Sequence, residues 1–139
     1  MSREVAGGCL CGTVRYLLTL PARFSAHCHC GNCRRAHGAA FVTYAGFREN
    51  QVRIDGVASL RRFVTKSGST RSFCGECGST LFYEGPRWPG ELHVVVANIE
   101  GDIGKPPAAH VFVDHGAEWW KIDDDLPQFG GVNGTEPKR

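Results

Sequence analysis

Seven cysteines stand in three short groups along this chain of 139 residues. Within each group one or two residues separate the cysteines, so their sulfurs can converge on one metal ion. Zn²⁺ suits such groups best, because it is a borderline-soft ion that accepts tetrahedral thiolate ligation. The odd count divides into four and three, which predicts one closed structural site and one open, reactive site. The groups are Cys9 and Cys11; Cys28, Cys30 and Cys33; and Cys74 and Cys77.

The last group is a zinc knuckle, in which one tight turn supplies two sulfurs and two further ligands must come from elsewhere. One source is Cys30-x-x-Cys33, but the 40 residues between Cys33 and Cys74 exceed the usual spacing of a zinc ribbon. The other source is the first group, whose two sulfurs would lie on one face of a strand. Spacing alone leaves both pairings open.

The middle group differs in kind, because histidines alternate with its cysteines. In an extended segment, His27-Cys28-His29-Cys30 would place both sulfurs on one side and both imidazoles on the other. With Cys33 entering through a turn, three sulfurs would leave one tetrahedral corner open for water or substrate. A helical turn could instead bring His37 into that corner and close the site. His29 and His37 are the nearest candidates for proton transfer. The other histidines, His93, His110 and His115, are predicted to be ordinary polar residues rather than ligands.

Length and composition narrow the class of protein. With 42% hydrophobic residues, we expect a single domain over residues 1–129, followed by a flexible polar tail over residues 130–139. No long apolar run and no signal peptide in residues 1–10 are found, which predicts a cytoplasmic protein with reduced cysteines and no membrane partner. The formal net charge of +2 and the lack of a basic tract argue against nucleic-acid binding.

Strands dominate the local sequence pattern and must position these groups. Runs of β-branched and aromatic residues alternate with Gly, Asn, Ser and Pro, and no stretch keeps a helical period over three turns. One short helix is predicted over residues 32–37, with Asn32 as a possible N-cap. The predicted strands cover residues 13–19, 40–47, 59–65, 80–84, 91–99, 109–114 and 118–122.

Several longer motifs around the cysteines resemble those of the glutathione-dependent formaldehyde-activating enzymes and their centromere-protein-V-like relatives. The motifs follow that family's order from residue 7 to residue 129, so the resemblance covers most of the chain. They are residues 7–16 (GGCLCGTVRY), 28–35 (CHCGNCRR), 38–41 (GAAF), 73–81 (FCGECGSTL), 110–113 (HVFV), Trp119 and residues 124–129 (DDLPQF).

The resemblance implies an assignment of the cysteines that spacing leaves open, with two zinc ions per chain. The first and last groups (Cys9, Cys11, Cys74, Cys77) would hold a structural zinc. The middle group (Cys28, Cys30, Cys33) would hold a second, catalytic zinc with an open position. It also implies a mainly β fold, the β-tent or Mss4-like fold, in which antiparallel sheets meet at the structural zinc.

The activity implied by the resemblance is that of a carbon–sulfur lyase acting on an adduct of a thiol and an aldehyde, such as S-hydroxymethylglutathione. Glutathione or another small thiol, and an aldehyde, would be its partners. Arg34 and Arg35 could pair with the carboxylates of the thiol, because guanidinium groups bind carboxylates through two parallel hydrogen bonds. The alternative is a non-catalytic, zinc-stabilised β-tent binding module. The oligomeric state is left open.

Overall fold

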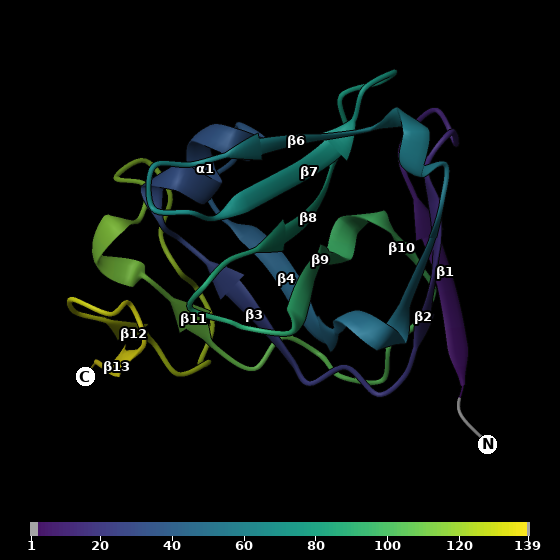
Figure 1. Cartoon of the computed structure of the whole chain (residues 1–139). Coiled ribbons are helices and arrows are strands. Elements are labelled where there is room, and N and C mark those ends of the chain that lie inside the picture. Colours follow the sequence, from purple (N-terminus) through teal and green to yellow (C-terminus); the bar gives the residue numbers. More distant parts are fainter. Residues whose placement is uncertain (1–2, 139) are drawn as a thin grey trace. The chain divides into compact units, whose positions relative to one another are not determined.

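The computed structural model describes residues 3–138, and strands are its main elements (Figure 1). The chain forms two compact units. The first unit comprises the chain up to Arg23 together with Ala45–Lys105, and the second comprises Phe24–Tyr44 together with the chain from Pro106 onward. The strand pairs of the first unit are antiparallel, which confirms the predicted mainly β class. The expected single domain over residues 1–129 stays a prediction.

One sheet of the first unit contains four strands, in the order Ile99–Glu100 (β10), Glu4–Gly8 (β1), Arg15–Thr19 (β2) and Val52–Asp55 (β5). Alternate side chains of β2 are buried, as expected for a strand with one face on a core. The connection from β1 to β2 is closed by the Cys9 N–H, which donates to the Val14 carbonyl. Gly12 takes a left-handed conformation there (φ 82°), which glycine adopts without steric cost. This turn carries the first cysteine group.

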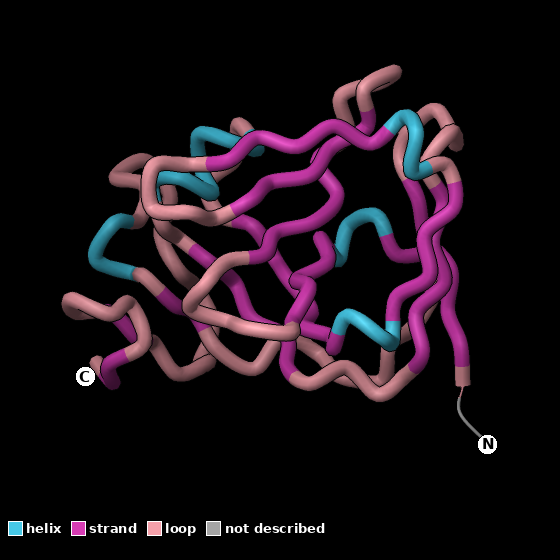
Figure 2. The backbone as a smooth tube through the Cα atoms, viewed as in Figure 1, coloured by secondary structure: helices cyan, strands magenta, loops and turns pink. Residues whose placement is uncertain are grey.

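The other strands of the first unit lie in the order Val42–Arg48 (β4), Glu91–Val95 (β9), Thr80–Glu84 (β8), Thr70–Cys74 (β7) and Leu60–Val64 (β6), where β4 begins in the second unit. The strands β6, β7 and β8 follow one another through short connections (Figure 2). In the turn from β7 to β8, the Gly78 N–H donates to the Cys74 carbonyl and the Cys74 N–H donates to the Ser79 carbonyl. This turn carries the last cysteine group.

The hydrophobic core of the first unit holds both of these turns in place. Phe47, Leu81 and Phe82 are at most 1% exposed, and each such side chain contributes about 1.5–3 kcal/mol on burial. The rings of Tyr16 and Phe82 meet edge to face at 5.3 Å. Cys74 is fully buried in the same core. Within residues 3–138, four 3₁₀ turns connect the elements: Glu49–Gln51 (η1), Val57–Ser59 (η2), Val96–Asn98 (η3) and, in the second unit, Val113–His115 (η4).

The second unit contains Phe24–Cys28 (β3), Gly31–His37 (α1) and the short strands His110–Val111 (β11), Phe129–Gly130 (β12) and Glu136–Pro137 (β13). β11 runs parallel to β3, with His110 opposite His27, and β12 pairs antiparallel with β13. The helix ends at Gly38 in a left-handed conformation (φ 61°). The register of β11 against β3 brings histidines together that are far apart in the sequence.

Two predicted details of the second unit are wrong. No strand forms over residues 118–122, where the backbone turns instead. Trp119 is 71% exposed there, and Trp120 packs on the ring of Phe41. The N-cap of α1 is Cys30 rather than Asn32: its sulfur accepts the Cys33 N–H, as a capping side chain does.

Other expectations differ in extent or stay open. The strand predicted over residues 91–99 ends at Val95, because η3 interrupts it before β10. The strands β1, β3, β5 and β7 were not among the predicted strands. Within the predicted tail, residues 136–137 pair with residues 129–130, and the flexibility of residues 130–139 stays a prediction. No helix in the described part of the chain is both long enough and apolar enough to span a membrane.

Candidate functional site

Four sulfurs of the first unit meet where the turn after β1 approaches the turn after β7. The Sγ atoms of Cys9 and Cys11 lie 3.7 Å apart, and those of Cys11 and Cys74 lie 3.8 Å apart. With Cys77, all four lie within 4.8 Å of one another. A tetrahedral site with Zn–S bonds of about 2.3 Å places its sulfurs about 3.8 Å apart, so this four-sulfur group fits zinc. Spacing left two possible partners for the zinc knuckle. In the structure, the last cysteine group lies with the first group and not with the middle one.

Hydrogen-bond donors surround the four-sulfur group. The Val14 N–H donates to Cys9 Sγ at 3.2 Å. The Ser79 hydroxyl lies 3.2 Å from Cys77 Sγ, and this hydroxyl, together with the Ser79 backbone N–H, lowers the pKa of Cys77 to about 5. The thiolate is the form of cysteine that binds metal. These donors therefore favour the charge state that a metal site requires.

The middle cysteines form a three-sulfur group in the second unit. Cys28 ends β3, Cys30 caps α1, and Cys33 lies in the first turn of that helix. The Sγ atoms of Cys33 and Cys28 are 3.5 Å apart, and both residues are buried. Hydrogen bonds with Cys30 and Cys33, together with burial, raise the pKa of Cys28. A bound cation would oppose this effect, because it favours thiolates, and the soft donor set is one that zinc accepts.

His37 lies beside this group without joining it. Its Nε2 atom is 3.3 Å from the hydroxyl of Tyr44, and that hydroxyl is 3.6 Å from Cys33 Sγ. Among the described residues, the ligand atoms that meet here are the three sulfurs alone. Tyr44 thus connects His37 to the three-sulfur group. Sequence reasoning missed this role of Tyr44, because it placed the residue in a strand without assigning it a face.

A hydrogen-bonded chain of two buried histidines and an exposed aspartate lies on the imidazole side of the Cys28–Cys30 segment. His29 Nε2 is 2.8 Å from His110 Nδ1, and His110 Nε2 is 3.0 Å from a carboxylate oxygen of Asp124. His29 is 2% exposed and His110 is 1% exposed. The His27 ring lies 4.7 Å from the His110 ring. His27 and His29 therefore do face one side together, as the alternation predicts.

Burial, charge and hydrogen bonds set the protonation states of the two ends of this hydrogen-bonded chain, His29 and Asp124. Burial, followed by repulsion from His110 and His27, lowers the pKa of His29 to about 4. The hydrogen bond with His110, and one from the Leu126 N–H, lowers the pKa of Asp124. His29 is therefore neutral and Asp124 ionised at neutral pH. Sequence reasoning missed His110 and Asp124 as functional candidates, although both lie in the motifs that carry the family resemblance.

A cavity of about 310 Å³ adjoins His29 in the second unit. Its lining combines apolar side chains with a few polar ones, as small-molecule sites do. The ring of Trp120 stacks at 6.1 Å from His29 and lies 4.9 Å from Phe41. The cavity is also lined by Val113, Gly116, Lys121, Ile122 and Gln128. No cysteine lines this cavity, but His29 stands between Cys28 and Cys30 in the sequence, which makes the cavity the candidate place for a substrate.

The two predicted carboxylate-binding arginines have different surroundings. Arg34 is half-buried, and its Nη1 donates to the carbonyl of His115 at 3.1 Å. Its Nε is buried without a partner. Arg35 is exposed on α1. Arg34 therefore anchors the end of η4, whereas Arg35 is exposed to solvent.

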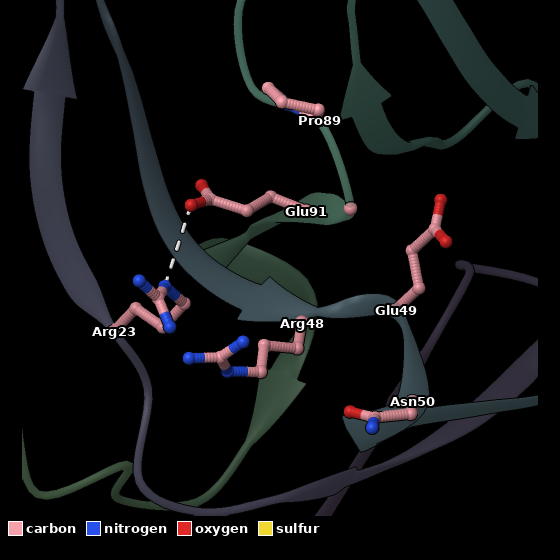
Figure 3. A pocket seen from close by; sticks show the side chains of 7 residues that line it. Arg23, Arg48, Glu49, Asn50, Pro89 and Glu91 are labelled. Carbon is pink, nitrogen blue, oxygen red and sulfur yellow. Dashed lines mark ion pairs between the residues drawn. The ribbon is translucent and has the colours of Figure 1, made fainter.

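A second cavity, of about 350 Å³, belongs entirely to the first unit (Figure 3). Arg23 and Glu91 form an ion pair there, with Arg23 Nε 3.4 Å from the carboxylate, and the Arg48 guanidinium lies beside that of Arg23. Its charged lining is two arginines and two glutamates, with no cysteine or histidine. This cavity therefore lacks the residues of either sulfur group.

Comparison with known proteins identifies relatives of this chain. Residues 4–115 match the sequence profile of the glutathione-dependent formaldehyde-activating enzymes. A Halomonas elongata protein, provisionally named as such an enzyme, is 27% identical over 133 residues, 84% of this chain and 80% of that protein. An uncharacterised lyase of Schizosaccharomyces pombe is 25% identical over 80 residues, 58% of this chain and 57% of that protein. The crystal structure of a Rhodobacter sphaeroides protein is similar with a TM-score of 0.60 and 29% identity, over 70% of this chain and 89% of that one.

Proposed function

Because the chain belongs to the family of glutathione-dependent formaldehyde-activating enzymes, we propose that it is a zinc-dependent carbon–sulfur lyase. Its substrate would be an adduct of a small thiol and an aldehyde, of the S-hydroxymethylglutathione type. The observation that carries this proposal is the three-sulfur group (Cys28, Cys30, Cys33). A cavity is lined by His29, which stands between Cys28 and Cys30 in the sequence. A purely structural role would need only the four-sulfur group, so the second group is left for chemistry.

Zinc is the cofactor that both groups fit, one ion at each. At the three-sulfur group, a bound zinc supplies a Lewis acid and stabilises a thiolate at neutral pH, with a fourth position left for an exchangeable ligand. At the four-sulfur group, zinc supplies folding free energy. We assign Cys9, Cys11, Cys74 and Cys77 to the structural ion and Cys28, Cys30 and Cys33 to the catalytic ion.

The chain's own residues account for the proton movements of the reaction. When an S-hydroxymethyl adduct is split, the hydroxyl proton leaves, the C–O bond becomes a carbonyl, and the electron pair of the C–S bond passes to sulfur. His29 lines the cavity and is the candidate acceptor of the hydroxyl proton. His37, which contacts Tyr44 beside Cys33, is the candidate for proton exchange with the departing thiol. The reverse reaction uses the same groups in the opposite order.

The proposal is tested by assaying the zinc-loaded protein for formaldehyde release from S-hydroxymethyl adducts of glutathione, cysteine and 2-mercaptoethanol. We expect release to be accelerated, most strongly for glutathione. Limited chelation is expected to abolish activity before the fold is lost, because an open three-sulfur site releases metal more readily than a closed one. A folded protein with both ions bound that accelerates none of the three reactions would point to a zinc-stabilised binding module instead.

Arg35 is proposed to bind a carboxylate of the thiol, and Arg34 to hold the site together as well. Replacing Arg35 with alanine is expected to raise KM for the glutathione adduct about tenfold, the worth of one charge-assisted hydrogen bond, without changing Tm. Replacing Arg34 with alanine is expected to raise KM and also to lower the free energy of unfolding by about 1 kcal/mol, because its hydrogen bond to the His115 carbonyl is lost. Steady-state kinetics and thermal denaturation separate the two effects.

The matched control for these variants is Arg62→Ala, because Arg62 is an exposed arginine on β6 of the first unit. It should alter neither KM nor Tm. An Arg35→Ala protein with unchanged KM for the glutathione adduct would show that Arg35 is not part of the substrate site.

The cytoplasmic location and the small-molecule partners are part of the same proposal. The location is checked by fractionating cells that express the chain.

A further inference from the structure

We propose that Asp124 and His110 are positioning residues, which fix His29 in the tautomer protonated on Nε2 and so direct its Nδ1 lone pair at the cavity lined by Trp120 and Gly116. In this arrangement Nδ1 accepts the hydrogen bond of the hydroxyl group on the bound adduct. The inference rests on the proposed function for the identity of that hydroxyl. The tautomer itself is a property of the resting protein.

The direction of each hydrogen bond follows from the group at the end of the chain. An ionised carboxylate only accepts hydrogen bonds, so His110 Nε2, 3.0 Å from Asp124, must carry a proton. In a neutral imidazole the other ring nitrogen is then an acceptor. His110 Nδ1 therefore accepts from His29 Nε2, which lies 2.8 Å away. With its proton on Nε2, neutral His29 has its only lone pair on Nδ1.

That lone pair faces the place where a ligand can bind. A Cβ placed on Gly116 would lie 3.8 Å from His29 Nδ1 and 3.9 Å from His29 Cβ, so the Nδ1 edge of this side chain lies beside Gly116, which lines the same cavity. Trp120 stacks on the His29 ring and covers it from the side.

The same chain also explains why residues distant in sequence must be held together. His110 reaches His29 because β11 pairs in parallel with β3, in the register that sets His110 opposite His27. Asp124 is held in turn by the Leu126 N–H, which donates to its carboxylate at 3.0 Å. If the hydrogen bonds among His29, His110 and Asp124 were only structural, they would hold these segments together whichever nitrogen carried each proton. The tautomer is therefore the property that distinguishes the two roles.

The test is a two-bond ¹H–¹⁵N correlation spectrum of the histidine side chains in zinc-loaded, ¹⁵N-labelled protein, at a pH of about 8, where histidine with an ordinary pKa is neutral. The His29 signals are assigned by their loss in His29→Gln. We expect His29 to be protonated on Nε2 in the unaltered protein. In Asp124→Asn the amide can either accept from or donate to His110, so we expect the fixed tautomer to give way to a mixture or to its reverse.

Kinetics complete the test. Asp124→Asn is expected to lower kcat about 100-fold, the usual worth of a well-placed proton acceptor, with KM, zinc content and Tm nearly unchanged. Asp125→Asn, a neighbouring exposed carboxylate, is the matched control and should behave as the unaltered protein. The inference is overturned if His29 carries its proton on Nδ1, if His110 is doubly protonated, or if Asp124→Asn leaves the tautomer unchanged. Absence of lyase activity with the expected tautomer would contradict the proposed function alone.

Discussion

Replacing Cys77 with serine is expected to yield an insoluble or poorly folded protein. The four-sulfur group joins the turn after β1 to the turn after β7, and the rest of that group includes Cys74, which is fully buried in the core. A structural zinc site contributes folding free energy on the order of 10 kcal/mol, whereas a whole domain is stable by only about 5–15 kcal/mol. Loss of one thiolate ligand is therefore expected to remove most of the free energy of unfolding. Soluble yield, zinc content and thermal denaturation measure the effect.

The control for this variant is Leu10→Ser, a change in the other turn of the four-sulfur group, the one after β1, that removes no ligand. Leu10 is 88% exposed, so its replacement should leave yield, zinc content and Tm unaltered.

The hydrogen bonds around Cys77 predict a variant in which weaker zinc binding is separated from loss of the fold. Ser79→Ala removes the hydroxyl that lies 3.2 Å from Cys77 Sγ but leaves the thiolate, so it should weaken zinc binding without abolishing the fold. A soluble Cys77→Ser protein with the Tm of the unaltered chain would contradict the structural role.

The sequence was sufficient to predict the three cysteine groups and the mainly β class, because both depend on local patterns. It could not choose between the two pairings of the zinc knuckle, because that choice depends on which turns meet across the first unit. The turn holding Cys9 and the turn holding Cys74 meet because β1 and β7 are fixed by a common core. Sequence spacing carries no such information.

The errors in the predicted strands have a similar cause. β1 (Glu4–Gly8) contains two adjacent glycines, which lower strand propensity, and it forms because β2 and β10 pair with it on either side. Conversely, residues 118–122 have a strand-like composition, but no strand pairs with them in the described structure. Tertiary pairing overrides local preference in both cases.

The His29–His110–Asp124 chain lies furthest from what sequence patterns can show. His110 is 81 residues from His29, and no periodicity links the two. What joins them is the parallel register of a strand only two residues long. A buried histidine with two hydrogen-bonded partners is recognised from the structure, whereas in the sequence it resembles any polar residue in a β-branched run.

Replacing Cys33 with serine is expected to leave the fold intact, to remove one zinc ion and to abolish lyase activity. Cys33 belongs to the second unit and takes no part in the four-sulfur group, so the structural ion should stay. Serine is close to cysteine in size but is a far weaker zinc ligand, because its hydroxyl stays protonated at neutral pH. We expect zinc contents of about two for the unaltered chain and about one for this variant.

The contrast between the two cysteine substitutions is the sharpest test of the division of labour. Asn32→Ser, an exposed change on the same helix, controls for disturbance of α1 and should keep both ions and full activity. If Cys33→Ser and Cys77→Ser lower solubility equally, the two sulfur groups are both structural and the lyase proposal fails with them. If Cys33→Ser keeps both ions but loses activity, Cys33 acts on the substrate rather than on the metal. Only a folded, inactive protein with one ion agrees with an open three-sulfur site that binds the reacting thiol.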